Sequence, residues 1–299
     1  MLLWGIDLGG TKIEGVVLES REHPVVLKRM RVPTEAHLGY EHILNQIIKL
    51  VEVLIAEIGI RPYQIGIGTP GTLDPMTGLM KNCNSTVLNE KKLPQDLERI
   101  LQIPIKIAND ANCFAIAEAT IGIVPEVFPS ASVVFGVIMG TGVGGGLVVD
   151  GKLLSGRQGI AGEWGHNFLD DSGGACYCGK VGCVERVISG PALEQYYQKI
   201  SGEPLRLTTI VERHSTRQDI HATQTIERLI DSFGKAISTV INIVDPDVVV
   251  LGGGLSKINL LYTDGVKAVE KYVFNPRLNT KFLAPKLGDS AGVFGAALL

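Results

Sequence analysis

The chain has 299 residues, more than a single hydrophobic core usually serves, which predicts two domains with a cleft between them. Its 45% hydrophobic residues, 20% charged residues and net charge of −3 are typical of a globular enzyme or binding protein and exclude the basic surface that nucleic-acid binding needs. The start, MLLWGIDLGG, has no cationic leader, so we expect a cytoplasmic protein. The apolar stretch 132–149 is interrupted by GTGVGG, which indicates two buried strands rather than a membrane span.

The first half of the chain reads as strands alternating with helices. Strand-like runs at 2–8 and 13–19 flank a glycine turn, and a helical pattern follows at 40–58. Further strands are predicted at 63–68 and 103–108, before a helix at 111–119. This order predicts α/β architecture.

The second half begins with a segment that resembles the first. Residues 5–18 align without a gap on 136–149 and share four identities, and both segments read as strand, Gly/Thr turn, strand. We therefore expect a duplicated domain whose two β-hairpins form opposite walls of one cleft. Helical patterns at 223–243, after residue 256 and at 292–299, with a strand at 248–254, complete the chain.

Two glycine turns have the composition of phosphate-binding loops. DLGGTK at 7–12 and GTGVGGG at 140–146 bring backbone N–H groups together without side chains in the way. The second contains G-x-G-x-x-G, but the dinucleotide fingerprint needs a following helix and LVVDGKLL reads as a strand. The glycines also suit plain hairpins, although two turns in matched positions favour phosphate binding.

Two further features extend this hypothesis. Asp7 ends the first strand, where its carboxylate suits Mg²⁺ bound through water as well as a turn aspartate that caps its own backbone. The stretch DPDVVVLGGGLS at 245–256 reads as a buried strand running into Gly252, Gly253 and Gly254, which suits a base or ribose lying on bare backbone, or an ordinary strand-to-helix turn.

Asp110 lies at the carboxyl end of a predicted strand and just before a helix. Parallel strands present ligand-binding groups at this end, so Asp110 is a candidate general base for an attacking hydroxyl, with Asn109 orienting the acceptor. Helix capping by Asn109 or Asp110 explains the same stretch equally well.

One short loop holds three of the five cysteines. His166, Cys176, Cys178 and Cys183 are the ligand types that zinc prefers, and four protein ligands would make the metal structural. Ordinary buried thiols, or a thiol redox sensor, are the alternatives. Glu163 and Glu185 flank the loop, and paired carboxylates suit adjacent sugar hydroxyls.

The motifs DLGGTK, NDAN at 109–112, GTGVGGG, GEWGH, CYCGKVGCVE and DPDVVVLGGGLS, in this order from Gly5 to Gly295, resemble the ROK family of bacterial sugar kinases and repressors. The resemblance implies an α/β, two-domain, actin-like or hexokinase-like ATPase fold whose inter-domain cleft binds ATP and sugar. The implied domains are a small N-terminal one, 1–118 joined by the C-terminal helix at about 289–299, and a larger one, 119–288, that carries the zinc loop.

The resemblance also assigns roles to residues. Asp110 corresponds to the general base, and His166 corresponds to both a zinc ligand and a sugar contact. The other implied sugar contacts are Asn84, Asn109, Glu163 and Glu185. The implied phosphate and nucleoside contacts, besides Asp7, are Gly9, Gly10, Thr11, Lys12, Thr141, Gly142, Gly253 and Gly254.

The function implied is transfer of the γ-phosphoryl group of Mg-ATP to the 6-hydroxyl of a hexose. KNCNSTVLN at 81–89 and CYCGKVGC most resemble fructokinases of the manno(fructo)kinase type, which predicts fructose, with mannose second. An N-acetylglucosamine kinase or glucokinase is the alternative within the family. A sugar-responsive repressor is disfavoured because only six residues precede Asp7, which leaves no room for a helix-turn-helix segment. The family suggests a homodimer that binds neither nucleic acid nor membrane.

Overall fold

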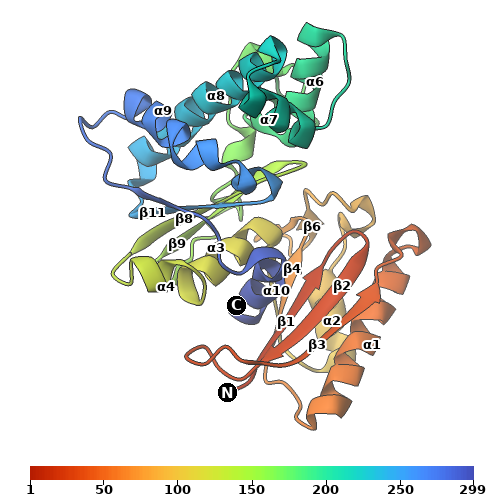
Figure 1. The fold of residues 1–299 in the computed structure, drawn as a ribbon. Coiled ribbons are helices and arrows are strands. Elements are labelled where there is room, and N and C mark those ends of the chain that lie inside the picture. Colours follow the sequence, from red (N-terminus) through yellow and green to blue (C-terminus); the bar gives the residue numbers. More distant parts are fainter. The chain divides into compact units, whose positions relative to one another are not determined.

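The predicted turn after the first strand is present and joins β1 (Leu3–Leu8) to β2 (Lys12–Leu18) as an antiparallel pair. The computed structural model describes residues 1–299, and its first sheet has the order β3-β2-β1-β4-β7 (Figure 1). The other strands of this sheet are β3 (Val26–Pro33), β4 (Ile65–Thr69) and β7 (Ile105–Asn109). β4 and β7 run parallel to β1, so their carboxyl ends lie at one edge.

The chain divides into two compact units. The first unit contains 1–130, 146–161 and 286–299, and the second contains 131–145 and 162–285. The C-terminal helix therefore groups with the first unit, as do residues 146–161, whereas the resemblance implied one uninterrupted larger domain over 119–288.

Helices cover both faces of the first sheet. Its helices are α1 (Tyr40–Ile58), α2 (Leu93–Leu101), α3 (Asp110–Thr120), α4 (Val124–Val127) and α10 (Ala291–Ala297). A short hairpin of β5 (Thr72–Leu73) and β6 (Met80–Lys81) is added after β4. Three 3₁₀ turns belong to this unit, η1 (Ala36–Leu38), η2 (Thr86–Leu88) and η7 (Gly288–Ser290).

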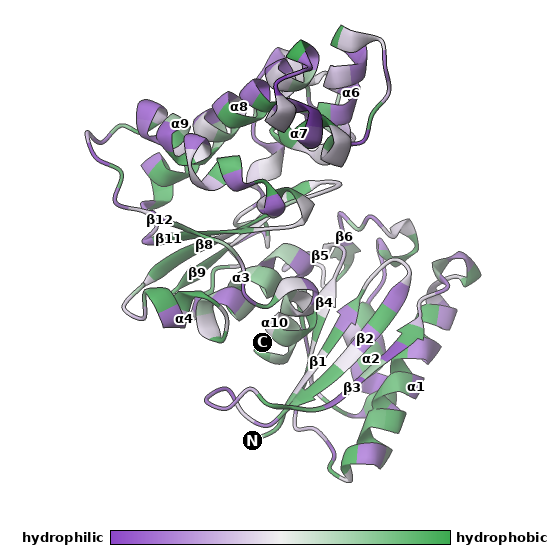
Figure 2. Cartoon of the chain, viewed as in Figure 1, coloured by the Kyte–Doolittle hydropathy of each residue, from purple (hydrophilic) through white to green (hydrophobic).

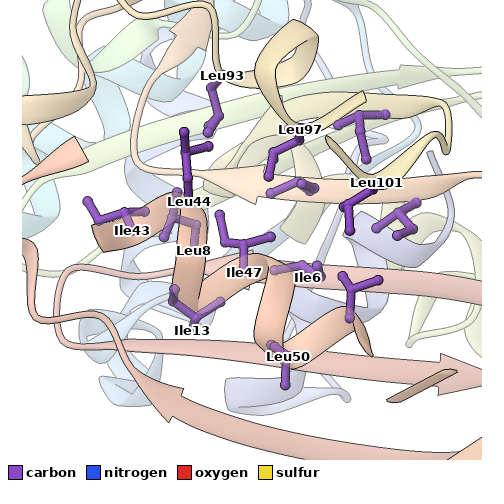
Figure 3. Close-up of a cluster of buried hydrophobic side chains, with 14 of the residues drawn as sticks. Ile6, Leu8, Ile13, Ile43, Leu44, Ile47, Leu50, Leu93, Leu97 and Leu101 are labelled. Atoms are coloured by element: carbon purple, nitrogen blue, oxygen red, sulfur yellow. The ribbon is translucent and has the colours of Figure 1, made fainter. Parts of the chain in front are cut away.

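The strand period of two decides which side chains meet which helix. On β1 and β2, alternate residues join one hydrophobic cluster with the buried face of α1 and with α2 (Figure 3). This cluster includes Ile6, Leu8, Ile13, Ile47 and Leu97, each at most 2% exposed. Each such side chain contributes about 1.5–3 kcal/mol on burial. The helix α1 is amphipathic, and Figure 2 shows hydrophilic and hydrophobic residues alternating along it.

The opposite face of the sheet is covered by α10 and α3 at very short range. A Cβ on Gly66 would lie 1.8 Å from the carbonyl oxygen of Ala296, and one on Gly295 would lie 1.8 Å from that of Cys113. Only glycine at these two positions lets α10 approach β4 and α3 backbone to backbone. α10 is thus fixed on β4 and in turn packs on α3, so the position of α3 is set by α10 as well as by β7.

A buried carboxylate fixes the far end of α3. Glu118 has no exposed surface and accepts three backbone N–H bonds, from Ile123 at 3.0 Å, Lys286 at 3.1 Å and Leu287 at 2.8 Å. Such charge-assisted bonds satisfy a carboxylate that would otherwise be costly to bury. They tie the segment that leads into α10 to the end of α3.

The second unit contains a sheet in which β8 (Val133–Met139) lies between the first residues of β9 (Val143–Val149) and β11 (Val248–Gly252). β11 also pairs in parallel with β12 (Lys281–Leu283). The later residues of β9, in the first unit, pair with β10 (Lys152–Leu153). Residues 140–142 of GTGVGG therefore separate two strands, as the sequence predicts, and its other residues begin β9, with no helix after it.

The helices of the second unit pack around the longest of them, α8 (Ile220–Val244). The others are α5 (Glu185–Ile188), α6 (Gly190–Ser201), α7 (Leu207–Thr216) and α9 (Asp264–Tyr272). The 3₁₀ turns are η3 (Trp164–His166), η4 (Asp171–Gly173), η5 (Gly254–Lys257) and η6 (Asn259–Tyr262). Phe233 of α8 meets Phe282 of β12 edge to face, which docks the longest helix on the sheet. No helix of the chain combines the length and apolar character that crossing a membrane requires.

Candidate active site

The first glycine turn is held by Thr34, the residue that follows β3. The N–H of Gly9 donates to the carbonyl of Lys12 at 3.0 Å, which closes the turn. Thr34 donates its hydroxyl to the carbonyl of Gly9 at 2.7 Å and its N–H to the carbonyl of Thr11 at 3.0 Å. Gly10, Thr11 and Lys12 are exposed, so the turn presents backbone to a ligand.

A row of charged side chains crosses the sheet beside this turn. Asp7 pairs with Glu14 across β1 and β2, and Glu14 pairs with Arg31 of β3, so all three lie on one face. The buried Glu14 carboxylate contacts Arg29, Arg31 at 2.9 Å and Lys12 at 3.7 Å. Burial alone would raise the pKa of Glu14, but bonds to Arg29 and Arg31 outweigh burial and lower it. Glu14 thereby holds Lys12 of the turn in place.

Asp7 is held in an environment that disfavours its charge. Burial first, then the carboxylates of Asp110 and Glu14, raise the pKa of Asp7 to about 6, while Lys12 opposes the shift. A Cβ on Gly292 would lie 3.2 Å from the Asp7 carboxylate, so α10 begins directly beside it. Asp7 and Asp110, two carboxylates that repel each other, are suited to share a divalent cation or its water.

Asp110 and Asn109 occupy the junction of β7 and α3. Asn109 ends β7 and caps the helix, since its Oδ1 accepts the N–H of Asn112 at 2.8 Å. The capping alternative therefore applies to Asn109. Asp110 is the first residue of α3, and its Oδ1 accepts the N–H of Ala111 at 2.8 Å.

The Asp110 side chain is exposed to solvent although many protein atoms surround it. That surrounding protein raises the pKa of the Asp110 carboxyl, against the lowering effect of the backbone bond from Ala111. A carboxylate with a raised pKa at a strand end is suited to accept a proton from an attacking hydroxyl.

Asn84 lies in the same region of the first unit. Its N–H donates to the carbonyl of Pro70 at 3.2 Å, in the turn that follows β4. The hydroxyl of the next residue, Ser85, would lie 3.9 Å from a Cβ on Gly10. The loop of Asn84 therefore lies beside the first glycine turn, and the Asn84 side chain is exposed.

In the second unit, three backbone segments meet at Gly140. Gly140 bonds to Gly142 within its own turn, and its carbonyl accepts the N–H of Gly190 at 2.9 Å. A Cβ on Gly140 would lie 3.8 Å from the nitrogen of Gly254. The exposed Thr141 and the exposed pair Gly253 and Gly254 thus border one glycine-lined surface at the start of α6.

Glu185 links this turn to the cysteine loop. Its Oε2 accepts the N–H of Val143 at 2.9 Å, in the strand that follows the turn. Trp164 donates its indole N–H to the carbonyl of Gly144 at 2.8 Å, next to Glu163, which precedes η3. One oxygen of Glu185 is therefore engaged by the backbone, a bond that the sequence did not predict for this candidate sugar contact.

The four predicted zinc ligands converge. The Nδ1 of His166 and the sulfurs of Cys176, Cys178 and Cys183 all lie within 4.8 Å of one another. His166 Nδ1 is 3.7 Å from Cys176 Sγ, and the sulfurs of Cys178 and Cys183 are 3.6 Å apart. A tetrahedral zinc ion would separate two sulfurs by about 3.8 Å and a sulfur from a nitrogen by about 3.6 Å. The donor set thus fits zinc in chemistry and in size.

The other ring nitrogen of His166 has a partner of its own. Nε2 lies 2.9 Å from the hydroxyl of Tyr177, and the two rings meet edge to face at 5.1 Å. Burial, then the charges of Glu185, Cys176 and Glu163, raise the pKa of Tyr177 to about 12. Tyr177 is therefore within the electrostatic reach of both candidate sugar-binding glutamates.

The predicted residues thus form two groups, one in each unit. The first unit brings together the turn at 9–12, Asp7, Asn84, Asn109 and Asp110, and the second brings together the turn at 140–142, Gly253, Gly254 and the cysteine loop with its glutamates. Glu14, Gly190 and Tyr177 were not predicted from the sequence as residues of the site. Ser189-Gly190-Pro191 carries a signal that could have been found, because Ser followed by Gly-Pro is a helix start.

Comparisons with known proteins agree over the whole chain. The family model of the ROK family matches residues 3–299. The N-acetyl-D-glucosamine kinase of Vibrio parahaemolyticus is 35% identical over 308 residues, which cover 100% of this chain and 99% of the relative. The N-acetyl-D-glucosamine kinase of Pectobacterium atrosepticum is 36% identical over 317 residues, which cover 100% of this chain and 98% of the relative.

Solved structures give the same result for the fold. The ROK hexokinase from Thermus thermophilus has a TM-score of 0.88 and 30% identity, over 100% of this chain and 97% of that one. A ROK family glucokinase from Streptomyces griseus, solved with glucose and AMPPNP, has a TM-score of 0.77 and 26% identity, over 99% of this chain and 98% of that one. The predicted two-domain α/β fold of the actin-like, hexokinase-like type is confirmed.

The environment of Asp7 predicts a pH dependence of stability. Because its pKa is raised from 3.8 to about 6, the native state holds the proton more tightly than the unfolded chain. The stabilisation that protonated Asp7 gives the native state is complete below its pKa in the unfolded chain, 3.8, and is lost as the pH rises through about 6. Between about pH 4 and pH 8, Asp7→Asn should therefore gain about 2 kcal/mol in unfolding free energy relative to the wild type.

Urea unfolding of both proteins across this pH range measures that difference. Asp74→Asn is a control of opposite sign, because backbone bonds from Met76 and Thr77 and the Lys81 ammonium lower the pKa of Asp74. A difference between Asp7→Asn and the wild type that stays constant with pH would contradict the assignment.

Proposed function

The chain belongs to the ROK family and is an ATP-dependent sugar kinase, and we propose that its acceptor is the 6-hydroxyl of N-acetyl-D-glucosamine. One observation carries the proposal, which is the 33–36% identity to N-acetyl-D-glucosamine kinases over the whole chain. The fructose preference predicted from 81–89 and CYCGKVGC, with mannose second, is not supported by these relatives. The alternative left open by the sequence, an N-acetylglucosamine kinase, agrees with them better.

Asp110 is the general base in this proposal. Its carboxylate follows the carboxyl end of β7 and has a raised pKa, so it accepts the proton of the 6-hydroxyl as the bond to the γ-phosphorus forms. Asn109 uses its side chain to cap α3 and so fixes the first turn that carries Asp110. Base catalysis of this kind contributes about 10²–10⁴-fold to the rate.

The sugar contacts come from Asn84 and Asn109 in the first unit and from Glu163, His166 and Glu185 in the second. Carboxylates and amides are suited to bind adjacent hydroxyls with paired hydrogen bonds. Trp164, between Glu163 and His166, is anchored to the carbonyl of Gly144 and keeps both neighbours in fixed positions. Loss of one such anchor would loosen two candidate contacts together.

The nucleotide contacts are mainly backbone groups. In the first unit they are Gly9, Gly10, Thr11 and Lys12, and in the second they are Thr141, Gly142, Gly253 and Gly254. Lys12 adds a charge that Glu14 holds beside the turn. Mg²⁺ would neutralise phosphate charge, and Asp7 is the carboxylate beside the turn that suits its hydration shell.

Zinc is proposed as a structural cofactor held by His166, Cys176, Cys178 and Cys183. Four protein ligands leave no open coordination position, so the ion would stiffen the loop rather than take part in the reaction. Backbone bonds between Leu169 and Gly182 and between Cys176 and Lys180 shape the loop around the ligands. The cytoplasmic location and the homodimer stay predictions.

The acceptor is tested by steady-state kinetics with Mg-ATP and five sugars. We expect N-acetyl-D-glucosamine to give a kcat/KM at least about tenfold above those of glucose, mannose and fructose, because these sugars lack the acetamido group and leave its protein partners unpaired. We expect the same margin over N-acetylmannosamine, because its opposite configuration at C2 points the acetamido group elsewhere. ATP turnover without sugar gives the background. Fructose or mannose as the best acceptor would restore the specificity predicted from the sequence and refute the proposal.

The metal is tested by elemental analysis combined with thiol titration. The purified protein should hold about one zinc ion per chain, and chelation should make three further thiols reactive. Cys183→Ser should lose the metal, whereas Cys83→Ser, at a buried cysteine outside the cluster, should keep it. Metal-free protein whose loop thiols form a disulfide reversibly would instead support the redox sensor.

A further inference from the structure

The hydrogen bond between His166 and Tyr177 engages the Nε2 of His166, which the proposed sugar site needs. His166 faces the cysteine cluster with Nδ1, 3.7 Å from Cys176 Sγ, and faces Tyr177 with Nε2, at 2.9 Å from the hydroxyl oxygen. The two nitrogens therefore have separate tasks. Only Nε2 is turned away from the cluster and toward a group outside it.

Zinc bound to Nδ1, as proposed above, would fix the tautomer of His166. A histidine that binds a metal through Nδ1 is neutral and carries its proton on Nε2. Nε2–H is then a single donor, and the Tyr177 oxygen accepts from it. A sugar hydroxyl that accepts from the same N–H has to replace Tyr177.

We propose that Tyr177 is an affinity-determining residue whose hydroxyl holds the sugar-binding position on His166 while the site is empty and leaves it when a hexose binds. This inference rests on the proposed function, because it takes His166 as a sugar contact. It adds a residue that competes with the sugar and therefore sets the affinity of the site.

The surroundings of Tyr177 let its side chain move while its backbone stays fixed. Cys176 donates its N–H to the carbonyl of Lys180 at 2.8 Å and Gly179 donates to the carbonyl of Cys176 at 3.0 Å, so the backbone around Tyr177 forms a closed turn. The side chain is 73% exposed and packs edge-on against His166. Its release gives up one hydrogen bond and one ring contact.

The neighbouring charges favour the exchange. Glu163 precedes the 3₁₀ turn of His166, and Glu185 lies two residues after the proposed ligand Cys183, so a hexose bound at His166 has two candidate carboxylate partners. Each carboxylate can accept bonds from sugar hydroxyls, whereas Tyr177 offers a single O–H. A polyol therefore makes more hydrogen bonds at this position than the phenol that it displaces.

Tyr177→Phe tests the inference, because it removes the hydroxyl and keeps the ring. The zinc-loaded variant should bind the best hexose of the acceptor panel about two- to tenfold more tightly than the wild type, the change expected for one lost competing hydrogen bond. Calorimetric titration of that hexose, without nucleotide, gives Kd, and kinetics give KM for the hexose and for ATP. Only the hexose values should change.

Tyr63→Phe is the matched control, since Tyr63 is also 76% exposed and lies in the first unit. Unchanged or weaker hexose binding by Tyr177→Phe would overturn the inference, as would a fall in zinc content with unchanged affinity, which would assign Tyr177 to the metal loop. A best acceptor other than N-acetyl-D-glucosamine would refute the proposed substrate alone, because the comparison of variants is made on whichever hexose binds.

Discussion

The position of one helix start, at the carboxyl end of β7, determines where the proposed base of the first unit lies. Asn109 caps α3, so the first turn of the helix and the backbone of Asp110 are set together. Gly295 lets α10 pack against the backbone of Cys113 in the middle of α3, and Glu118 binds the segment before α10 at the far end. α3 is thus restrained at its start, middle and end, which preorganises the carboxylate that it carries.

In the second unit a short loop, rather than a helix, positions the candidate sugar contacts. Cys183 belongs to the ligand cluster, and Glu185, two residues later, accepts a bond from the glycine turn at Val143. A metal that fixes Cys183 therefore also restrains Glu185 and the start of β9. His166 joins the same cluster and holds the Tyr177 hydroxyl on its other side. The cluster thus connects the candidate sugar contacts of this unit to its candidate phosphate turn.

The sequence predicted the features that depend on local pattern. Both glycine turns and the junction of strand and helix at Asn109 are each coded within a few residues, and the four clustered ligands lie in one loop recognisable by residue type; the structure has them. β3 was missed because its charged residues, Lys28, Arg29 and Arg31, do not read as a buried strand. Arg29 and Arg31 find their partner in Glu14, more than ten residues away, which the pairing of β2 with β3 brings close.

Gly190 and Tyr177 were missed for a similar reason, because their partners Gly140 and His166 are distant in sequence. The preferred substrate was the feature that local motifs predicted least well. The loops at 81–89 and 176–183 pointed to fructose, while identity over the whole chain favours N-acetyl-D-glucosamine.

The most direct measurement of the central assignment is phosphoryl transfer by Asp110→Asn under single-turnover conditions, with nucleotide affinity measured on the same preparation. The account predicts a rate lower by about 10²–10⁴-fold with nearly unchanged ATP binding, because the amide keeps the shape of the side chain and cannot accept the proton. A variant that phosphorylates its hexose within a few-fold of the wild-type rate would contradict it.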